Sequence, residues 1–200
     1  MNQRTRAHTG PSSLLAMAVV IAAIIGAVGY RSVPTTFASA DVRAPEAGEA
    51  LGTADGAVPV GVTVFDDELP AVVNLDPDLL AALRRAATRA AREGVTLSVN
   101  SGWRSRAYQA QLLREAVEKY GSEEEAARWV ATPDTSPHVS GHAVDIGRPA
   151  AAAWLAEHGA AYGLCRIYAN EPWHFELRPD AVEHGCPPLY PDPTHDPRMR

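Results

Sequence analysis

Ser136–Asp145 reads S-P-H-V-S-G-H-A-V-D and Glu171–His174 reads E-P-W-H, and these two stretches together offer a His, Asp and His set of metal ligands with a spare carboxylate. A catalytic zinc ion takes three protein ligands from His, Asp or Glu. Its fourth position stays open for a water molecule, whose pKa it lowers toward neutrality. His138, Asp145 and His174 have the chemistry of those three ligands. The sequence therefore predicts a zinc hydrolase.

Glu171 lies three residues before the last of these ligands and is suited to take the proton of that water and pass it to a leaving amine. A second arrangement is also conceivable, because His138 and His142 are four residues apart, as zinc ligands are in H-E-x-x-H helices. Val139 stands where that motif needs its Glu, and Gly141 would weaken a helix by about 1 kcal/mol relative to Ala. We therefore do not expect His142 to be a ligand.

The pattern S-x-H-x-x-G-x-A-x-D, followed by E-x-W-H, resembles the VanY-like D-alanyl-D-alanine carboxypeptidases of the M15 peptidase family. The resemblance covers roughly residues 60–180. It implies one Zn²⁺ ion held by His138, Asp145 and His174, a catalytic base at Glu171, and substrate contacts from Ser136 and Trp173.

A third stretch, Ser101–Gln109, reads S-G-W-R-S-R-A-Y-Q and resembles the S-G-Y-R-S segment of the same family. The arginine of that segment faces the substrate, which makes Arg104 the expected electrophilic partner of the scissile carbonyl. Such a charge is worth roughly a few kcal/mol of barrier in a water-poor cleft. Gln109 lies at the spacing of a further substrate contact, and Trp103 replaces the commoner Tyr.

The resemblance implies a zinc-dependent carboxypeptidase that removes the terminal D-alanine from peptidoglycan stem peptides. Three other activities on the same substrate class remain open: a D,D-dipeptidase, an L,D-carboxypeptidase and an endopeptidase. A non-catalytic, zinc-dependent wall-binding module is a further alternative, but such a module has no need of the base Glu171. We expect a monomer.

The composition fits one ordinary domain with appendages, since the 200 residues are 46% hydrophobic. Lys and Arg number 18 against 24 Asp and Glu, which gives a net charge of -6. There is no basic cluster beyond the N-terminus. These features argue against nucleic acid as a partner.

The N-terminus predicts export. Arg4 and Arg6 precede an apolar run over residues 14–28, and no acidic residue occurs before Asp41. Such a run is typical of a signal peptide and is short for a bilayer span, so residues 1–30 are either a signal peptide or a membrane anchor. Both alternatives place the following chain outside the cytoplasm of a bacterium, either secreted or anchored to its cell membrane.

Residues 31–60 are expected to form a flexible linker, residues 61–190 the peptidase domain, and residues 191–200 a disordered tail. The expected fold is α+β, a single domain with a small, mainly antiparallel sheet flanked by helices and the zinc site at the sheet edge. Asp76 as N-cap and Pro77 start a helix that Gly94 ends. Its predicted apolar stripe consists of Leu79, Leu80, Leu83, Ala87 and Ala91. Further helices are expected at 106–119, from Ser122 onward and at 149–159, with strands at 95–99, 143–146, 165–169 and 173–177.

Cys165 and Cys186 are the only cysteines. An even cysteine count in an exported chain predicts a disulfide, and neither residue has the spacing of a paired metal ligand. Closing a loop of about 20 residues stabilises a fold by roughly 3 kcal/mol in the chain-entropy account.

Overall fold

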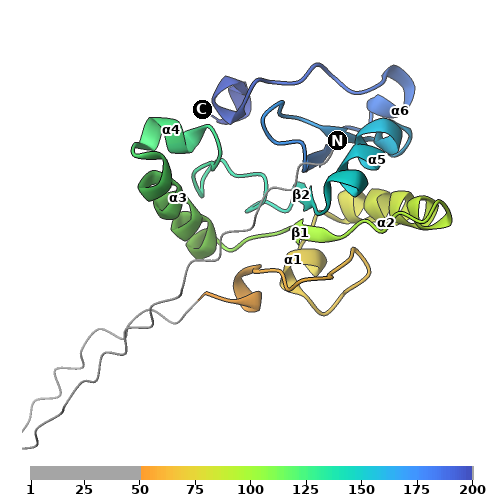
Figure 1. Ribbon diagram of the computed structural model, residues 1–200, viewed down its shortest axis with the longest axis horizontal. Coiled ribbons are helices and arrows are strands. Elements are labelled where there is room, and N and C mark those ends of the chain that lie inside the picture. The colour runs from red at the N-terminus through yellow and green to blue at the C-terminus, as the bar shows by residue number, and fades with distance from the viewer. Residues whose placement is uncertain (1–50, 200) are drawn as a thin grey trace, which may run out of the picture. The chain divides into compact units, whose positions relative to one another are not determined.

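A computed structural model describes residues 51–199 of the chain (Figure 1). The predicted signal peptide or anchor at 1–30, and residues 31–50 of the predicted linker, lie outside the described residues. Within residues 51–199, no helix has the length and apolar character needed to cross a bilayer.

The described chain alternates short helices and short strands. The helices are α1 (Pro70–Val73), α2 (Pro77–Arg92), α3 (Arg106–Tyr120), α4 (Glu123–Ala127), α5 (Pro149–His158) and α6 (Ala181–His184). The strands are β1 (Val99–Ser101), β2 (Ala143–Ile146), β3 (Leu164–Arg166) and β4 (His174–Leu177). Single 3₁₀ turns occur at Thr53–Asp55, Gly159–Tyr162, Pro193–His195 and Pro197–Met199.

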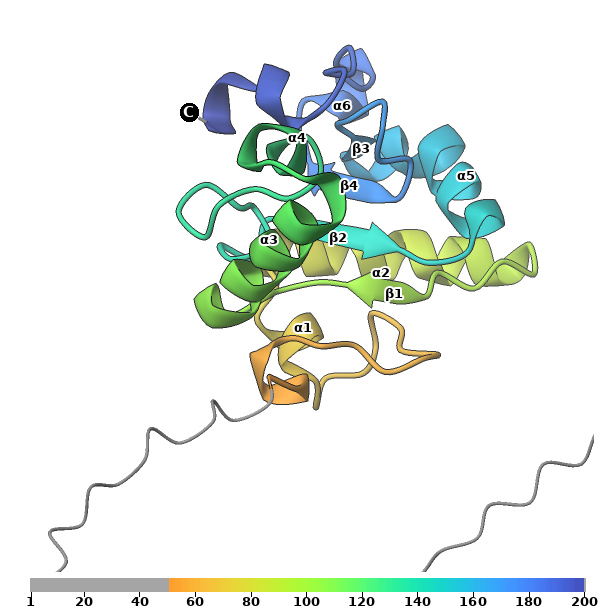
Figure 2. The ribbon, with the colours of Figure 1, turned by 60° about the vertical axis from the view of Figure 1, so that its left-hand side comes forward.

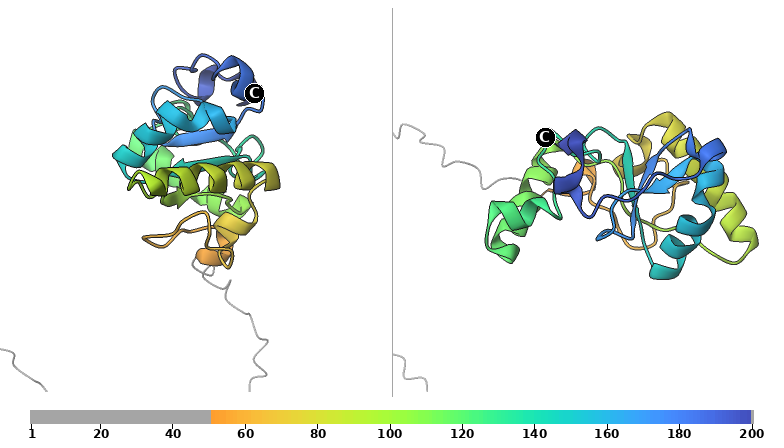
Figure 3. Two further views of the ribbon diagram at one scale, coloured as in Figure 1. Left: turned by 90° about the vertical axis from the view of Figure 1, so that its right-hand side faces the viewer. Right: turned by 90° about the horizontal axis from the view of Figure 1, so that it is seen from above.

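The four strands form one antiparallel sheet in the order β1-β2-β4-β3, so β2 and β4 are the central strands (Figure 2). Helices α2 and α5 pack on one side of this sheet, while α3 and α4 lie on the other side (Figure 3). The predicted α+β class, with a small antiparallel sheet flanked by helices, is confirmed.

Side-chain alternation gives the sheet two different faces, because successive residues of a strand point to opposite sides. Val144, Ile146 and Phe175 belong to the main hydrophobic core with α2 and α5. Asp145, His174 and Glu176 occupy the intervening positions and are therefore presented on the opposite face. The core thus holds the strands rigidly while their polar residues face α3.

Helix α2 begins as predicted, since the Asp76 carboxylate accepts hydrogen bonds from the backbone N–H groups of Asp78 and Leu79. Its buried face differs slightly from the predicted stripe: Leu80 is only partly buried and Ala91 is exposed. The buried residues are Leu79, Ala82, Leu83, Ala86, Ala87 and Ala90. The small alanine side chains allow the helix to lie close to the sheet.

The predicted strand at 95–99 was placed too early. Pairing starts at Ser98, which bridges to Thr63, and β1 then pairs with β2 through Val99 and Ile146. Residues 95–97 follow the left-handed turn at Gly94 and have no strand opposite them among the described residues. A ladder needs a partner strand, which the local sequence does not encode.

Two segments are more ordered than the sequence indicates. In the predicted linker, residues 53–55 form a 3₁₀ turn, and the Ser105 hydroxyl donates to the Asp55 carboxylate at 2.9 Å. In the predicted disordered tail, Asp192 and Asp196 are buried and two 3₁₀ turns lie beside α4 (Figures 1 and 2). Long-range ion pairs, which composition does not reveal, order this tail.

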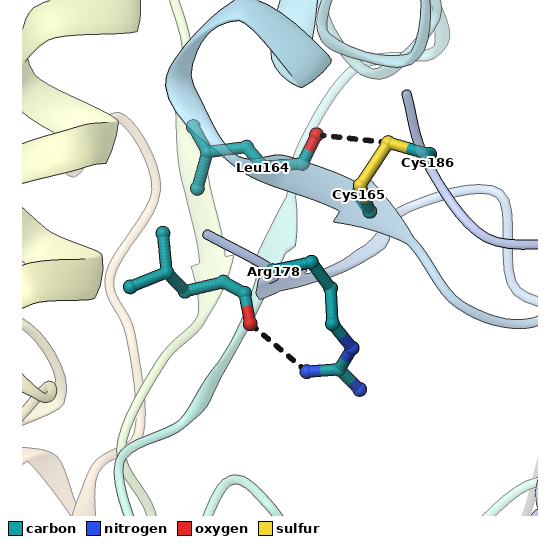
Figure 4. The surroundings of a disulfide bond; sticks show 5 residues. Leu164, Cys165, Arg178 and Cys186 are labelled. Atoms are coloured by element: carbon teal, nitrogen blue, oxygen red, sulfur yellow. Dashed lines mark hydrogen bonds between the residues drawn. A yellow bond between two sulfur atoms is a disulfide. The ribbon is translucent and has the colours of Figure 1, made fainter. Parts of the chain in front are cut away.

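The predicted disulfide is confirmed. Cys165 on β3 is joined to Cys186, with their Cα atoms 5.5 Å apart (Figure 4). The bridge attaches the segment that follows α6 to the edge strand of the sheet, and the C-terminal residues start from this fixed point.

Candidate active site

The three predicted metal ligands come together on the polar face of the sheet. Asp145 on β2 and His174 on β4 are directly opposite each other in the strand register. His138 comes from the turn-rich loop that precedes β2. All three side chains are buried, with residue exposures of 5% for His138, 8% for Asp145 and 3% for His174. They are a group of His, Cys, Asp or Glu residues within 51–199 whose spacing could hold a metal ion.

The donor atoms of this group are spaced like the corners of a tetrahedron. The His174 Nδ1 atom lies 3.2 Å from Asp145 Oδ1, and His138 Nε2 lies 3.3 Å from His174 Nδ1 and 3.4 Å from Asp145 Oδ1. Zinc-to-ligand distances of about 2.0–2.1 Å in tetrahedral coordination separate the donors by about 3.3 Å. The residues present therefore fit a zinc ion with three protein ligands.

Both imidazole rings are oriented by hydrogen bonds at the nitrogen that faces away from the group. The His138 Nδ1 atom lies 2.8 Å from the carbonyl oxygen of Gly102, and His174 Nε2 lies 3.1 Å from the Glu176 carboxylate. Both partners are hydrogen-bond acceptors, so His138 Nδ1 and His174 Nε2 each carry the proton that is donated to them. The lone pairs of His138 Nε2 and His174 Nδ1 are thereby left for a metal, as in many metal sites with ordered outer partners.

Two glycines of the motifs are required by close backbone approaches. A Cβ atom on Gly102 would lie 2.0 Å from the carbonyl oxygen of Ala71, and one on Gly141 would lie 2.5 Å from that of Asn74. Gly141 also has a positive φ of 76°. Gly102 carries the carbonyl that holds His138, so this close contact fixes a metal ligand indirectly.

Glu171 lies beside the metal group without belonging to it. Its Oε2 atom is 3.7 Å from His174 Nδ1, and its buried Oε1 atom has no hydrogen-bond partner among residues 51–199. Burial is the largest influence and raises the pKa of Glu171 to about 7, against the lowering effect of His174. A carboxyl group with a pKa near neutrality can both accept and return a proton.

The histidines and carboxylates strongly perturb one another's pKa values. Burial opposes a charge on His174, but hydrogen bonds to Asp145 and Glu176 outweigh it and raise the pKa of His174 to about 9. Burial and the nearby Arg104 lower the pKa of His138. Burial alone would raise the pKa of Asp145, but His138, His174 and Arg104 hold it well below its usual range. The site thus favours positive charge between its carboxylates, which a divalent cation would supply.

Arg104 is held in the same cleft by three partners. Its Nη2 atom donates to Asp145 Oδ2 at 2.9 Å, its Nε to Ser101 Oγ at 2.7 Å and its Nη1 to Gln109 Oε1 at 3.1 Å. The two oxygens of Asp145 therefore face different partners: Oδ1 faces the two histidines and Oδ2 accepts from Arg104. A guanidinium has five N–H donors, so two of those of Arg104 are left for a substrate.

The remaining predicted substrate contacts line this cleft, which has a volume of about 560 Å³. Ser136 is buried and its hydroxyl has no partner among residues 51–199, while Trp173 is 40% exposed. Gln109 is 1% exposed, and its amide also donates to the carbonyl of Ala131. Both ends of that amide are engaged within the protein, which favours a role in holding Arg104 over direct contact with substrate.

His142 lies apart from the metal group. Its side chain is 61% exposed, its Nδ1 atom is 2.9 Å from the Ser140 hydroxyl, and its Nε2 atom is 3.8 Å from Asp76 Oδ2. The sequence reasoning missed Glu176, although its position two residues after His174 on a strand places both on one face. It also missed Arg198, which pairs with Glu176 at 2.7 Å and has no local signal in the sequence.

The chain also matches a known protein family. The sequence model of the VanY family, described as D-alanyl-D-alanine carboxypeptidase, matches residues 73–180, which is more than half of the chain. The chain belongs to this family.

A D-alanyl-D-alanine carboxypeptidase of Enterococcus faecalis (strain ATCC 700802 / V583) is 30% identical over 139 residues, which are 56% of this chain. The alignment spans 52% of that relative, so this chain matches about half its length.

Solved structures share the fold. VanYB in complex with D-alanine-D-alanine aligns with a TM-score of 0.51 and 28% identity, covering 56% of this chain and 74% of that one. The LD-carboxypeptidase LdcB aligns with a TM-score of 0.51 and 24% identity, covering 66% and 72% respectively, and that likeness concerns the fold alone.

Proposed function

We propose that the protein is a zinc-dependent carboxypeptidase that removes the terminal D-alanine from peptidoglycan stem peptides. The observation that carries the proposal is the meeting of His138, Asp145 and His174 at tetrahedral spacing, with the acid Glu171 beside them. A wall-binding module would need the metal ligands but not a buried, unpartnered carboxylate.

The residues divide the proposed reaction among them. A zinc ion held by the three ligands would supply Lewis-acid chemistry, lowering the pKa of a water molecule and polarising a carbonyl group. Glu171 accepts the proton of the attacking water and returns it to the departing D-amino acid. The free N–H groups of Arg104 stabilise negative charge on the scissile carbonyl oxygen. The Ser136 hydroxyl and the exposed ring of Trp173 contact the peptide.

The shape of the cleft suits a short peptide end. Its volume of about 560 Å³ is that of a small-ligand site, and its walls combine the polar metal group with apolar residues of α3. Tyr120 and Trp129 stack with ring centroids 5.7 Å apart and form part of the apolar wall. D-alanyl-D-alanine is also the compound bound in VanYB, which supports this substrate class. Such a substrate implies action outside the cytoplasm, by a secreted or membrane-anchored protein.

The test is mass spectrometry of stem peptides incubated with the purified chain. A pentapeptide ending in D-alanyl-D-alanine should lose the mass of one alanine residue, and a tetrapeptide should be a poor substrate. Hydrolysis of free D-alanyl-D-alanine would indicate a D,D-dipeptidase, and trimming of the tetrapeptide an L,D-carboxypeptidase. Chelation should abolish turnover and added zinc should restore it. Turnover that survives complete removal of zinc contradicts the proposal.

A further inference from the structure

Residues 190–199, here called the C-terminal strap, lie against the segment that carries Glu171. The Tyr190 N–H donates to the carbonyl of Ile167 at 3.0 Å, and the Ala169 N–H donates to the carbonyl of Tyr190 at 2.8 Å. The Asn170 N–H donates to the carbonyl of Pro191 at 3.3 Å. The strap therefore follows the backbone up to the residue before the proposed base.

Buried acidic groups anchor the strap. Asp192 is 2% exposed and accepts from Arg128, the C-cap residue of α4, at 3.1 Å. Asp196 is 0% exposed and accepts from the Arg198 Nε atom and from the Tyr168 hydroxyl, each at 3.0 Å. Buried carboxylates are expensive unless they are paired, so these contacts define one position for the strap.

Arg198 joins the strap to the metal group through Glu176. Its Nη1 atom lies 2.7 Å from Glu176 Oε2 and its Nη2 atom lies 3.4 Å from Glu176 Oε1. Arg178 also donates to Glu176, but to Oε2 alone. Glu176 is 1% exposed, and its Oε1 atom is the one that accepts from His174 Nε2. Arg198 is thus the partner that spans both oxygens and sets the plane of this carboxylate.

The same strap constrains His174 from a second direction. The Tyr168 ring packs on the His174 ring with centroids 5.1 Å apart, and the Tyr168 hydroxyl is held by Asp196. The imidazole is therefore fixed in its own plane by Glu176 and across its face by Tyr168. Both supports depend on Asp196 and Arg198.

We propose that Arg198 is a positioning residue for the metal site, holding Glu176 so that it receives the Nε2–H of His174 and leaves Nδ1 for the metal. The inference rests on the proposed function, because it assigns the role in relation to the zinc ion. Removal of a group that hydrogen-bonds a metal-ligating His, as Glu176 does here, changes metal affinity by about 10- to 100-fold. Glu176 and the C-terminal strap would then be parts of the zinc site rather than surface structure.

The experiment measures zinc affinity of the full chain by competition with a chromophoric chelator, for the wild type and three variants. Arg198→Gln should weaken zinc binding by about 10-fold, the lower end of that range, because Arg198 acts on His174 through Glu176. Arg198→Lys should weaken zinc binding less than Arg198→Gln, because Lys keeps the positive charge. Some weakening should remain, because Lys cannot span two carboxylates. Arg128→Gln is the matched control, since Arg128 holds the strap at Asp192, is 48% exposed against 43% for Arg198, and does not contact Glu176. It should lower the melting temperature without changing zinc affinity.

Nitrogen-15 NMR of the His174 ring gives a readout that mere destabilisation would not move. The spectra are taken on the zinc-free chain at pH 10, above the pKa of about 9 of His174, so that the ring is neutral. The wild type and Arg128→Gln should then show the Nε2-protonated tautomer, and Arg198→Gln should show a mixture. Equal zinc affinity and equal tautomer populations in Arg198→Gln and Arg128→Gln overturn the inference. If Arg198→Gln does not fold, the same comparison is made with Arg198→Lys, with the same criterion. A wild-type chain that binds no zinc overturns the proposed function together with this inference, which distinguishes the two failures.

Discussion

Glu171→Gln should lower turnover without lowering stability. Glu171 is the proposed general base, but its carboxylate is buried in surroundings that disfavour its negative charge. The side chain is 7% exposed and its Oε1 atom has no partner among residues 51–199. Loss of a general base lowers turnover by about 10²- to 10⁴-fold, equivalent to about 3–5 kcal/mol of barrier. Zinc affinity should be retained, since Glu171 is not one of the three ligands.

The same substitution should stabilise the protein when zinc is chelated. The pKa of Glu171 rises from 4.5 to about 7 in the folded chain, so folding favours the protonated acid. The unfavourable contribution is absent below pH 4.5, grows as the pH rises above that value, and is complete above about 7. A shift of this size corresponds to about 3 kcal/mol at pH 8, which the neutral amide would largely remove.

Two assays check these expectations. Peptide hydrolysis with excess zinc gives kcat/KM, and urea unfolding with chelator at pH 4.5 and pH 8 gives the free energy of unfolding. Glu171→Gln should be more stable than the wild type at pH 8 and nearly equal to it at pH 4.5. Glu157→Gln, an exposed acid on α5, is the control and should change neither quantity. Turnover of Glu171→Gln within tenfold of the wild type would refute the assigned role, and a stability loss at pH 8 would refute the electrostatic reasoning.

Three further predictions concern the framework around the site. Gly102→Ala should destabilise the fold by about 3 kcal/mol or more, because its Cβ would lie 2.0 Å from the Ala71 carbonyl oxygen. Urea unfolding checks this against Gly94→Ala, where no atom lies within 4 Å of the added Cβ, and equal losses of stability in the two variants would contradict it. Replacing Cys165 and Cys186 together by Ala should lower the free energy of unfolding by about 3 kcal/mol, and an unchanged urea midpoint would count against it. Burial alone would raise the pKa of Asp192, but hydrogen bonds from Thr194, His195 and Arg128 lower it from 3.8 to about 2. The ionised carboxylate therefore adds about 1–2 kcal/mol to the free energy of unfolding above pH 4, and this contribution is lost as the pH falls through about 2. The Asp192→Asn variant should therefore be less stable than the wild type at pH 6 and equal to it near pH 1.5, and a constant difference between the two would contradict this assignment.

Local chemistry accounts for what the sequence predicts well. The Asp76-Pro77 pair marks the start of α2, and the cysteine count predicts the disulfide. The metal group could be anticipated because two of its members lie in one short motif. The face of each strand also follows from alternation alone.

The missed features all depend on partners far away in the sequence. Pairing in β1 begins where β2 supplies a partner, so the 95–99 segment could not reveal its own boundary. The strap is rich in proline and resembles a loose tail in composition, yet Arg198 meets Glu176 across 22 positions. Gln109 stays a predicted substrate contact, but its hydrogen bond to Arg104 and its burial are visible only in three dimensions.

A zinc anomalous difference map from a crystal of the full chain tests the central claim most directly. We expect one peak per chain, bonded to His138 Nε2, His174 Nδ1 and Asp145 Oδ1 at about 2.0–2.2 Å, with Glu171 beside it and not bonded. A peak at other residues, or no peak at saturating zinc, would contradict the assignment of these side chains to a catalytic metal centre.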